Sequence, residues 1–248
     1  MLQNSLARQG NFLFRYRSHL PLLILAAGFA LFVQLVRTDN LPSWIPYHCV
    51  EYSSVLVSLL GLLIRIVAVG YTPANTSGRN TKSQLADELN TTGIYSVVRH
   101  PLYLGNFFMW LGSVMLVAHG WFLLVFVLAY WIYYERIMYA EEQFLSGKFG
   151  KTYIDWANRT PAFFPGLQKP VAPAYPFSIR KVLKKEKNGV FAIFALLFVF
   201  HNIVFSVQKN KLSIENNWIL WMLLITGVGY LILKLIKKYS SLLDEKGR

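Results

Sequence analysis

The chain of 248 residues contains a single cysteine, Cys49. One thiol cannot form an internal disulfide, and it cannot supply a metal site that needs several thiolates; no metal is expected. Acidic residues are also scarce, because only 12 Asp and Glu accompany 25 Lys and Arg, for a net charge of +13. No internal repeat is visible. The basic segment 1–19 leads into an apolar run that has no small-residue cleavage site, so no cleavable signal peptide is expected.

Long apolar runs are what the chain has in abundance. Hydrophobic residues make up 54% of it, more than the roughly 45–50% of a soluble domain. A membrane-spanning helix needs about 20 apolar residues, and aromatic residues, here 16%, are typical of interfacial belts. The sequence therefore predicts an all-α, polytopic membrane protein, a single membrane domain over residues 1–248. About six transmembrane helices are expected, over roughly 20–36, 52–71, 102–118, 121–134, 190–207 and 218–236.

The basic residues are distributed unevenly between alternate connections of these six spans. One set of connections contains only Arg37, Lys209 and Lys211, whereas the other set and its flanks contain nearly all the remaining Lys and Arg. By the positive-inside rule, both termini are expected in the cytoplasm. The same placement accounts for the positive charge without a nucleic-acid partner. Arg65 is the exception, because it lies within the second span.

Several local features refine this topology. The short connection at His119-Gly120 predicts a tight hairpin of spans three and four. Span four is expected to continue as a cytoplasmic helical extension over 135–149, which Gly150 would end. The polar loop 72–99 carries a candidate short helix over 82–89, and the proline-rich segment 161–176 is expected to be irregular. Tyr133 and Tyr134 are expected in an interfacial belt, and His201 is expected to form a helix–helix hydrogen bond.

A run of lysines precedes span five, and it has two interpretations. It either anchors the chain by the positive-inside rule or attracts anionic lipid headgroups, which are worth about 1 kcal/mol per charge near the surface. Anionic headgroups are therefore expected partners. The run consists of Lys181, Lys184, Lys185 and Lys187.

Two polar motifs flank the predicted hairpin. Residues 93–105 read Gly-x-Tyr-x-x-x-Arg-His-Pro-x-Tyr-x-Gly and lead directly into span three. Residues 141–165 read Glu-Glu-x-x-Leu-x-x-x-Phe-Gly-x-x-Tyr-x-x-Trp-x-x-x-Thr-Pro-x-Phe-x-Pro. Taken singly, Pro101 suits the first turn of a helix, and His100 could be an ordinary helix N-terminal residue. Ionisable residues at the ends of membrane helices are costly to place and are often functional, so together the motifs indicate a membrane enzyme.

This pair of motifs resembles the integral-membrane methyltransferases that include isoprenylcysteine carboxyl methyltransferase and the phospholipid methyltransferases. The resemblance covers about 93–165 and implies that this core binds S-adenosylmethionine, the methyl donor. Matching the motif residue by residue carries over seven donor-site positions: Tyr95, Arg99, His100, Tyr103, Gly105, Glu141 and Glu142.

The chemistry of the donor suits these residue types. Arg99 and His100, with free N–H groups at a helix start, can meet its carboxylate or ribose. Glu141 or Glu142 can bind the ammonium group or the ribose hydroxyls of the donor. Aromatic faces can frame the adenine or the sulfonium, and Gly105 allows a helix or the ligand to approach closely. The aromatic candidates are Tyr103, Tyr153 and Trp156, of which the last two could instead only pack against the interface.

The acceptor is predicted from Arg65. This residue either snorkels to the interface or, with Arg79, Lys82 and Arg99, forms a basic site for phosphate or carboxylate. Arg65, Arg99 and His100 are accordingly the candidate catalytic residues. An anionic oxygen acceptor needs no general base, and none is evident. The segments 71–80 and 89–95 resemble the lipid A phosphate methyltransferase branch of this family, which implies a lipid A phosphate as acceptor and a bacterial inner-membrane location.

Other functions remain open at this stage. The acceptor could instead be an aminophospholipid or an isoprenoid carboxylate, which analysis of the product would distinguish. A membrane sterol-type reductase with a nicotinamide cofactor shares the Arg-His-Pro region, but it would carry more spans and a second basic site. A non-enzymatic membrane scaffold is the third alternative, although such a protein could have lost Glu141 or His100.

Overall fold

The computed structural model describes residues 2–17, 19–73, 86–245 and 247, and throughout them it is helical with irregular connections. The all-α prediction is therefore confirmed. The expected helix 82–89 lies mostly outside the described residues, as do Arg79 and Lys82, and its described part, 86–89, is not helical. The elements are α1 (Leu2–Arg15), α2 (His19–Arg37), α3 (Tyr47–Gly70), η1 (Gly93–Ser96), α4 (Pro101–Met115), α5 (Gly120–Phe149), α6 (Lys151–Ala157), α7 (Ile179–Gln208) and α8 (Trp218–Tyr239).

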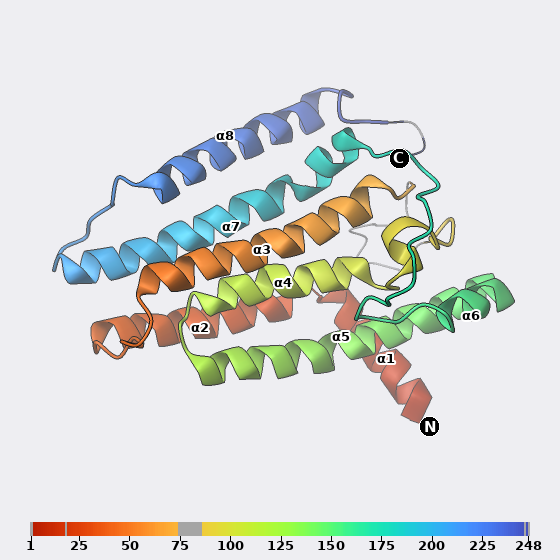
Figure 1. Cartoon of the computed structure of the whole chain (residues 1–248), viewed down its shortest axis with the longest axis horizontal. Helices are drawn as coiled ribbons and strands as arrows, with labels where there is room; N and C mark the ends of the chain where they lie inside the picture. The colour runs from red at the N-terminus through yellow and green to blue at the C-terminus, as the bar shows by residue number, and fades with distance from the viewer. Residues whose placement is uncertain (1, 18, 74–85, 246, 248) are drawn as a thin grey trace.

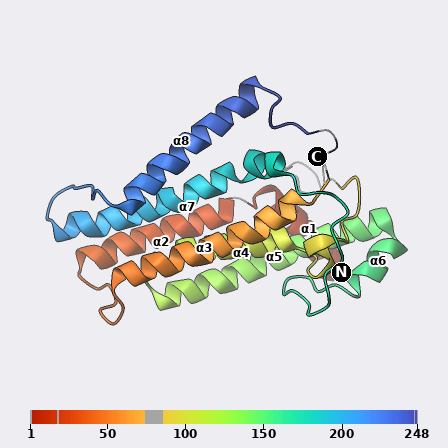
Figure 2. The ribbon, with the colours of Figure 1, turned by 45° about the horizontal axis from the view of Figure 1, so that its top comes forward.

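The long helices form a bundle in which successive helices run in opposite directions (Figure 1). Four of them, α3, α5, α7 and α8, are long and apolar enough to cross a membrane, so the chain is an integral membrane protein. The apolar parts of α2 and α4 are shorter, and the count of six spans stays a prediction. Both termini lie at the end of the bundle that also carries η1 and α6 (Figure 1). Figure 2 shows α8 diverging from the other helices towards this end.

The predicted hairpin and its helical extension are both present. The side chain of His119 caps the start of α5 by accepting a hydrogen bond from the Phe122 N–H at 3.2 Å. Helix α5 continues to Phe149, where Gly150 adopts φ +54°, a conformation that favours glycine. The segment 161–176 is irregular, as its prolines predict. It packs over the end of the bundle where the two polar motifs lie.

Close contact between α3 and α4 depends on three glycines. A Cβ added to Gly61 would overlap the Gly105 carbonyl, and one added to Gly105 would overlap the Arg65 side chain. A Cβ on Gly112 would overlap the hydroxyl of Ser58 and the backbone of Ser54. Small residues of this kind let membrane helices approach until their backbones touch. Gly105 thus allows a close approach, as expected, and the group that approaches it is helix α3.

The structure corrects two expectations about polar side chains. Tyr133 and Tyr134 are buried rather than exposed in a belt, because α1 crosses over α5 and covers them. Their hydroxyls donate hydrogen bonds to carbonyls in and just after α1, those of Leu13 at 3.1 Å and Arg17 at 3.3 Å.

The lysine run before span five is the second correction, because it is part of α7 and three of its members, Lys181, Lys184 and Lys187, have internal partners. Lys181 is buried and donates from Nζ to the carbonyls of Thr72 and Pro73 at 2.6 and 2.8 Å, just after α3 ends. Lys187 donates to the Lys184 carbonyl at 2.7 Å. Cations satisfy carbonyls at helix ends well, so part of the run stabilises the fold.

His201 forms the expected link between helices at the opposite end of the bundle. Its ring nitrogens lie 2.7 Å from a Glu51 oxygen on α3 and 2.5 Å from a Glu215 oxygen in the α7–α8 connection. The side-chain amide of Asn217, which caps α8, lies 2.8 Å from the same ring. Ionisable groups at membrane depth are paired in this way when they serve structure.

We expect Gly112→Ala to destabilise the protein, because its Cβ would overlap backbone atoms of α3. Overpacking of this kind costs about 1–3 kcal/mol, so the melting temperature in detergent should fall by several degrees. Gly229→Ala in α8 is the matched control, because a Cβ there meets nothing within 4 Å; it should leave the melting temperature equal or higher. Equal melting temperatures for the two variants would contradict the close α3–α4 contact.

Candidate functional site

The two sequence motifs meet at the end of the bundle that carries the termini. Backbone hydrogen bonds hold them together: the Arg99 N–H donates to the Pro161 carbonyl at 2.8 Å, and the His100 N–H donates to Ala162 at 3.1 Å. A third bond joins Gly166 N–H to Val97 at 2.8 Å. The second motif therefore fixes the backbone of the Arg-His pair, although some sixty residues separate them in the sequence.

The turn that precedes the pair is also held by the proline-rich segment. Gly93 adopts φ +60° and donates its N–H to the Val171 carbonyl at 2.9 Å. The Ser96 hydroxyl donates to the Gly93 carbonyl at 2.7 Å and accepts from the Val171 N–H at 2.9 Å. These bonds satisfy both donor and acceptor groups of a short 3-10 turn. Arg99 and His100 therefore have a defined direction into the site.

Glu142, near the end of α5, receives both basic side chains. Its Oε1 lies 2.9 Å from His100 Nε2 and 3.2 Å from an Arg99 guanidinium nitrogen. The other ring nitrogen of His100 lies 3.8 Å from Glu141. His100 is buried and occupies the N-cap position of α4, but its side chain makes no capping hydrogen bond. The ordinary role of a helix N-terminal residue therefore does not explain it.

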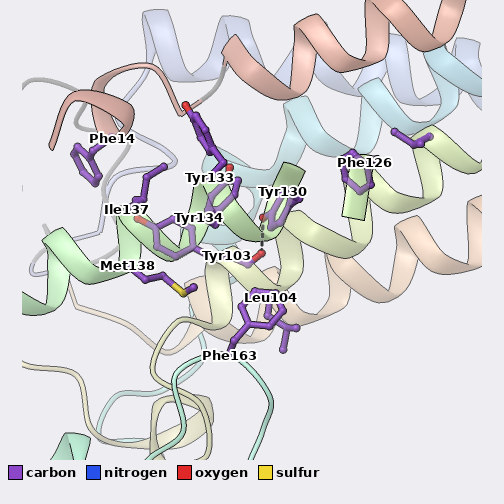
Figure 3. Packing of buried hydrophobic residues seen from close by; sticks show 11 residues of the cluster. Phe14, Tyr103, Leu104, Phe126, Tyr130, Tyr133, Tyr134, Ile137, Met138 and Phe163 are labelled. Carbon is purple, nitrogen blue, oxygen red and sulfur yellow. Dashed lines mark hydrogen bonds between the residues drawn. The ribbon is translucent and has the colours of Figure 1, made fainter. Parts of the chain in front are cut away.

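An aromatic cluster that includes Tyr103, Tyr130 and Tyr134 (Figure 3) lies next to the His100 ring on the side of the bundle. The Tyr103 ring stacks on His100 with centroids 5.6 Å apart. The Tyr130 hydroxyl donates to the Tyr103 carbonyl at 2.8 Å, and the Tyr134 ring stacks on Tyr130 at 4.1 Å. These residues join α4 to α5 beneath the Arg-His pair. Stacked rings of this kind restrict the orientation of the imidazole.

Helix α6 contributes the remaining aromatic candidates. The indole N–H of Trp156 donates to the Tyr95 carbonyl at 3.2 Å, so Trp156 positions the turn before the Arg-His pair. The Tyr153 side chain is 4% exposed, yet its hydroxyl has no hydrogen-bond partner among the described residues. Nε of Arg99 is likewise buried without a partner there. Buried polar groups are normally satisfied, and Arg99 is near enough to Tyr153 to lower its pKa, partly by hydrogen bonding. The two groups therefore lie next to one another and are candidates to bind a polar ligand.

The tyrosine hydroxyls of this site are expected to stay protonated. Burial raises the pKa of Tyr153, and the negative charge of Glu142 raises it further. Burial also raises the pKa of Tyr95, with a second contribution from Glu141. A neutral phenol can donate a hydrogen bond. Tyr153 can therefore act as a donor to an oxygen or a nitrogen of a bound ligand.

Arg65 lies in the bundle next to this site and has well-defined partners. It forms a two-point ion pair with Glu186 of α7, with nitrogen–oxygen distances of 2.7 and 2.8 Å. Its third contact is to the Asn106 side-chain oxygen at 2.5 Å. Glu186 is buried, and Gly105 lies directly beneath the arginine stem. The Arg65 side chain therefore points into the bundle and does not snorkel to the interface.

The structure brings together most of the predicted site residues and adds two. Arg99, His100, Glu141, Glu142, Tyr103 and Tyr95 converge on one end of the bundle, whereas Gly105 faces α3. Glu186 and Asn106 were missed. Glu186 lies within a lysine-rich stretch that reads as an interfacial anchor, and Asn106 follows the motif directly. The one available signal was that an arginine within a span requires a partner.

Comparison with protein families gives a match in this region. Residues 53–152 match the family described as phospholipid methyltransferase. This range contains most of α3 and all of α4 and α5, and therefore both parts of the Arg99–His100–Glu142 contact. No solved structure matches the chain.

Curated proteins give the same result. A nickel-cobalt-cadmium resistance protein, NccN, from Alcaligenes xylosoxydans xylosoxydans is 35% identical over 45% of this chain and 49% of its own length. Protein-S-isoprenylcysteine O-methyltransferase from Tribolium castaneum is 24% identical over 61% of this chain and 54% of its own. The Schizosaccharomyces pombe protein of the same name is 28% identical over 48% and 56%.

The chain thus spans about half the length of these curated relatives. The matches nevertheless confirm the resemblance carried by the two motifs, because the matched range holds the Arg-His-Pro sequence and the Glu-Glu pair. The central part of the chain, residues 53–152, is thus similar to the phospholipid methyltransferase family.

Proposed function

We propose that the protein transfers a methyl group from S-adenosylmethionine to an anionic lipid acceptor within the membrane. The observation that carries this proposal is the set of groups around Glu142. Two basic side chains meet a glutamate there, and beside them the Tyr153 hydroxyl and Arg99 Nε are buried without partners among the described residues. The family match over the same residues supports a methyl donor as the ligand.

The donor-binding residues offer groups that complement each part of the ligand. Arg99 Nε and the Tyr153 hydroxyl can donate hydrogen bonds to a carboxylate or to ribose oxygens. Glu141, which makes only the longer contact to His100, can accept from the ammonium group. The rings of Tyr103 and Trp156 offer faces for adenine or a cation. His100 and Glu142 hold these groups in place through their mutual contact.

The bound donor supplies an electrophilic methyl group that needs no further activation. The residues of this chain therefore have to orient two reactants and exclude water. The buried His100 and the aromatic cluster below it close the site on the side of the bundle. The Arg65 charge is near enough to Tyr95 to lower its pKa against the effect of burial. Arg65 is therefore the residue that we propose to contact the acceptor oxygen.

The proposed acceptor is a lipid A phosphate, and an isoprenoid carboxylate is the second candidate. Both present an anionic oxygen on a lipid, which can accept from the Arg65 N–H groups that the contacts with Glu186 and Asn106 do not use. The resemblance of segments 71–80 and 89–95 favours the phosphate. The names of the relatives from Tribolium castaneum and Schizosaccharomyces pombe, isoprenylcysteine O-methyltransferases, favour the carboxylate. We also propose a location in a bacterial inner membrane with both termini in the cytoplasm.

Donor binding should depend on the charge of Glu142. In Glu142→Gln and in His100→Ala, the Kd for S-adenosylmethionine measured by calorimetry should rise about tenfold or more, because charge-assisted hydrogen bonds contribute about 1.5–3 kcal/mol. Glu135→Gln, at an exposed site on the same helix, should keep the wild-type Kd. Unchanged donor affinity in both site variants, with normal melting temperature, would remove the site assignment.

The acceptor is tested with purified protein, labelled S-adenosylmethionine and four lipids: lipid A with and without its phosphates, phosphatidylethanolamine and a prenylcysteine. Label is expected in phosphorylated lipid A. Label in prenylcysteine instead would keep the reaction and replace the acceptor by a carboxylate. Label in phosphatidylethanolamine would mean that the acceptor is an amine and that a general base, which has not been identified among the site residues, removes its proton. Absence of donor binding would reject the methyltransferase.

The role of Arg65 is tested in the same assay. Removing one member of a buried ion pair costs about 3–5 kcal/mol by leaving the other charged, so we choose Arg65→Gln with Glu186→Gln, which removes both charges together. The double variant should bind the donor normally and show an acceptor KM raised about tenfold. Lys184→Gln with Asp244→Asn, which removes a more exposed ion pair, is the control and should keep the wild-type KM. A wild-type KM in the Arg65→Gln, Glu186→Gln variant would mean that Arg65 only joins α3 to α7.

The topology is tested with the single cysteine. Cys49 is exposed near the start of α3, at the end of the bundle opposite both termini. A membrane-impermeant maleimide should label it in intact spheroplasts. In Cys49→Ser combined with Ser240→Cys, which places the thiol after α8, labelling should require permeabilised membranes. The reverse pattern would place the termini outside.

A further inference from the structure

A groove lies between α1 and α5, away from the donor site. Its volume is about 740 Å³. It is formed where α1 crosses α5, at the same end of the bundle as the termini (Figure 1). The lining residues are Arg8, Gln9, Phe12, Leu13, Ala129, Ile132, Tyr133 and Arg136. The groove is thus apolar along most of its length, with two arginines among its lining.

The walls of the groove are held in place by direct contact between the two helices. Gly10 packs so closely on α5 that a Cβ would overlap the Arg136 carbonyl. The Tyr133 hydroxyl, in the groove wall, donates to the Leu13 carbonyl at 3.1 Å. The guanidinium of Arg136 donates to the Gln9 side chain at 3.1 Å and to the Ile132 carbonyl at 2.7 Å. The groove therefore has a defined shape before anything binds.

The charges in the groove are of one sign. Arg8 and Arg136 line it, and no carboxylate is among the described lining residues. Arg136 uses its contacts with Gln9 and Ile132 to hold its position, and neither of these partners is anionic. For Arg8, which is exposed, no ion pair is found within the described part of the chain. Two uncompensated guanidinium groups suit an anion, above all a phosphate that each can contact at two points.

The apolar wall continues onto the membrane-facing surface of α5. Ile132 is 53% exposed, and its neighbours one and two turns earlier, Leu128 and Val125, are 55% and 57% exposed on the same spanning helix. Phe12 on α1 is 61% exposed beside them. Helix α1 is amphipathic and carries two arginines, Arg8 and Arg15, as suits a helix in the plane of the interface. An occupant with a long apolar part therefore enters from the bilayer.

We propose that this groove binds one anionic phospholipid, with its phosphate between Arg8 and Arg136 and an acyl chain along Phe12, Ala129 and Ile132. The charge complementarity selects an anionic headgroup, and the continuity with the exposed face of α5 selects a lipid over an acidic peptide. The site is separate from the proposed donor and acceptor sites, so it does not depend on the methyltransferase proposal. It also relocates the expected headgroup contact from the lysine run of α7 to α1 and α5.

The test is native mass spectrometry of the purified, delipidated protein with phosphatidylglycerol and with phosphatidylcholine of the same acyl chains. The wild type should retain one phosphatidylglycerol at least tenfold more tightly than phosphatidylcholine. Arg8→Gln with Arg136→Gln should abolish this preference. Lys234→Gln with Lys238→Gln is the matched control, because it removes two charges from the last turns of α8 and should leave the preference intact.

A second variant tests the apolar part of the site. Ala129→Trp fills the groove and keeps both arginines, so it should also lose the retained lipid, while thermal unfolding confirms that the protein is folded. Retention of phosphatidylglycerol by Ala129→Trp would overturn the proposed acyl-chain site. Equal loss in the arginine and lysine double variants would reduce the effect to general surface charge. Displacement of the lipid by millimolar glycerol phosphate would mean that the site recognises a free phosphate and would also overturn the proposal.

Discussion

The contact of Glu142 with Arg99 and His100 is the interaction on which the arrangement of this end of the bundle depends. It joins the beginning of α4 to the end of α5, and these helices are already a hairpin at their other ends. A hairpin closed at both ends leaves little freedom for the relative position of its helices. The aromatic residues between them, Tyr103 and Tyr130, then pack in one arrangement (Figure 3). Preorganisation of this kind is what a reaction based on positioning requires.

Several other ionisable groups inside the bundle take partners, as the membrane requires. Arg65 and Glu186 neutralise each other, and His201 lies between two glutamates at the far end. Lys181 satisfies carbonyls at the end of α3. Charges left alone in a bilayer are costly, so these contacts are expected whatever the function. They do not by themselves indicate chemistry.

Much of this structure could be predicted from the sequence, because it depends on local patterns. Apolar runs predicted the helices, Gly150 predicted the end of α5, and two spaced motifs predicted that Arg99 and His100 share one site with the acidic residues, although not that they pair with them. The partner of Arg65 could not be predicted in this way. Glu186 is 121 residues distant, and its pairing depends on how α7 packs against α3. Burial of Tyr133 depends on α1 crossing α5, which no periodicity in either helix reveals.

Whether a buried polar side chain has a hydrogen-bond partner distinguishes the groups that stabilise the fold from those that form the proposed site. In a bundle where Arg65, Lys181 and His201 all have partners, a buried hydroxyl and a buried guanidinium nitrogen without a geometric partner among the described residues are unusual. Those of Tyr153 and Arg99 occur beside Glu142, within or next to the family match. A missing hydrogen bond in a buried place costs about 1–3 kcal/mol, a cost that a polar ligand removes when it binds. The exceptions therefore support a binding site more strongly than the ion pairs around them do.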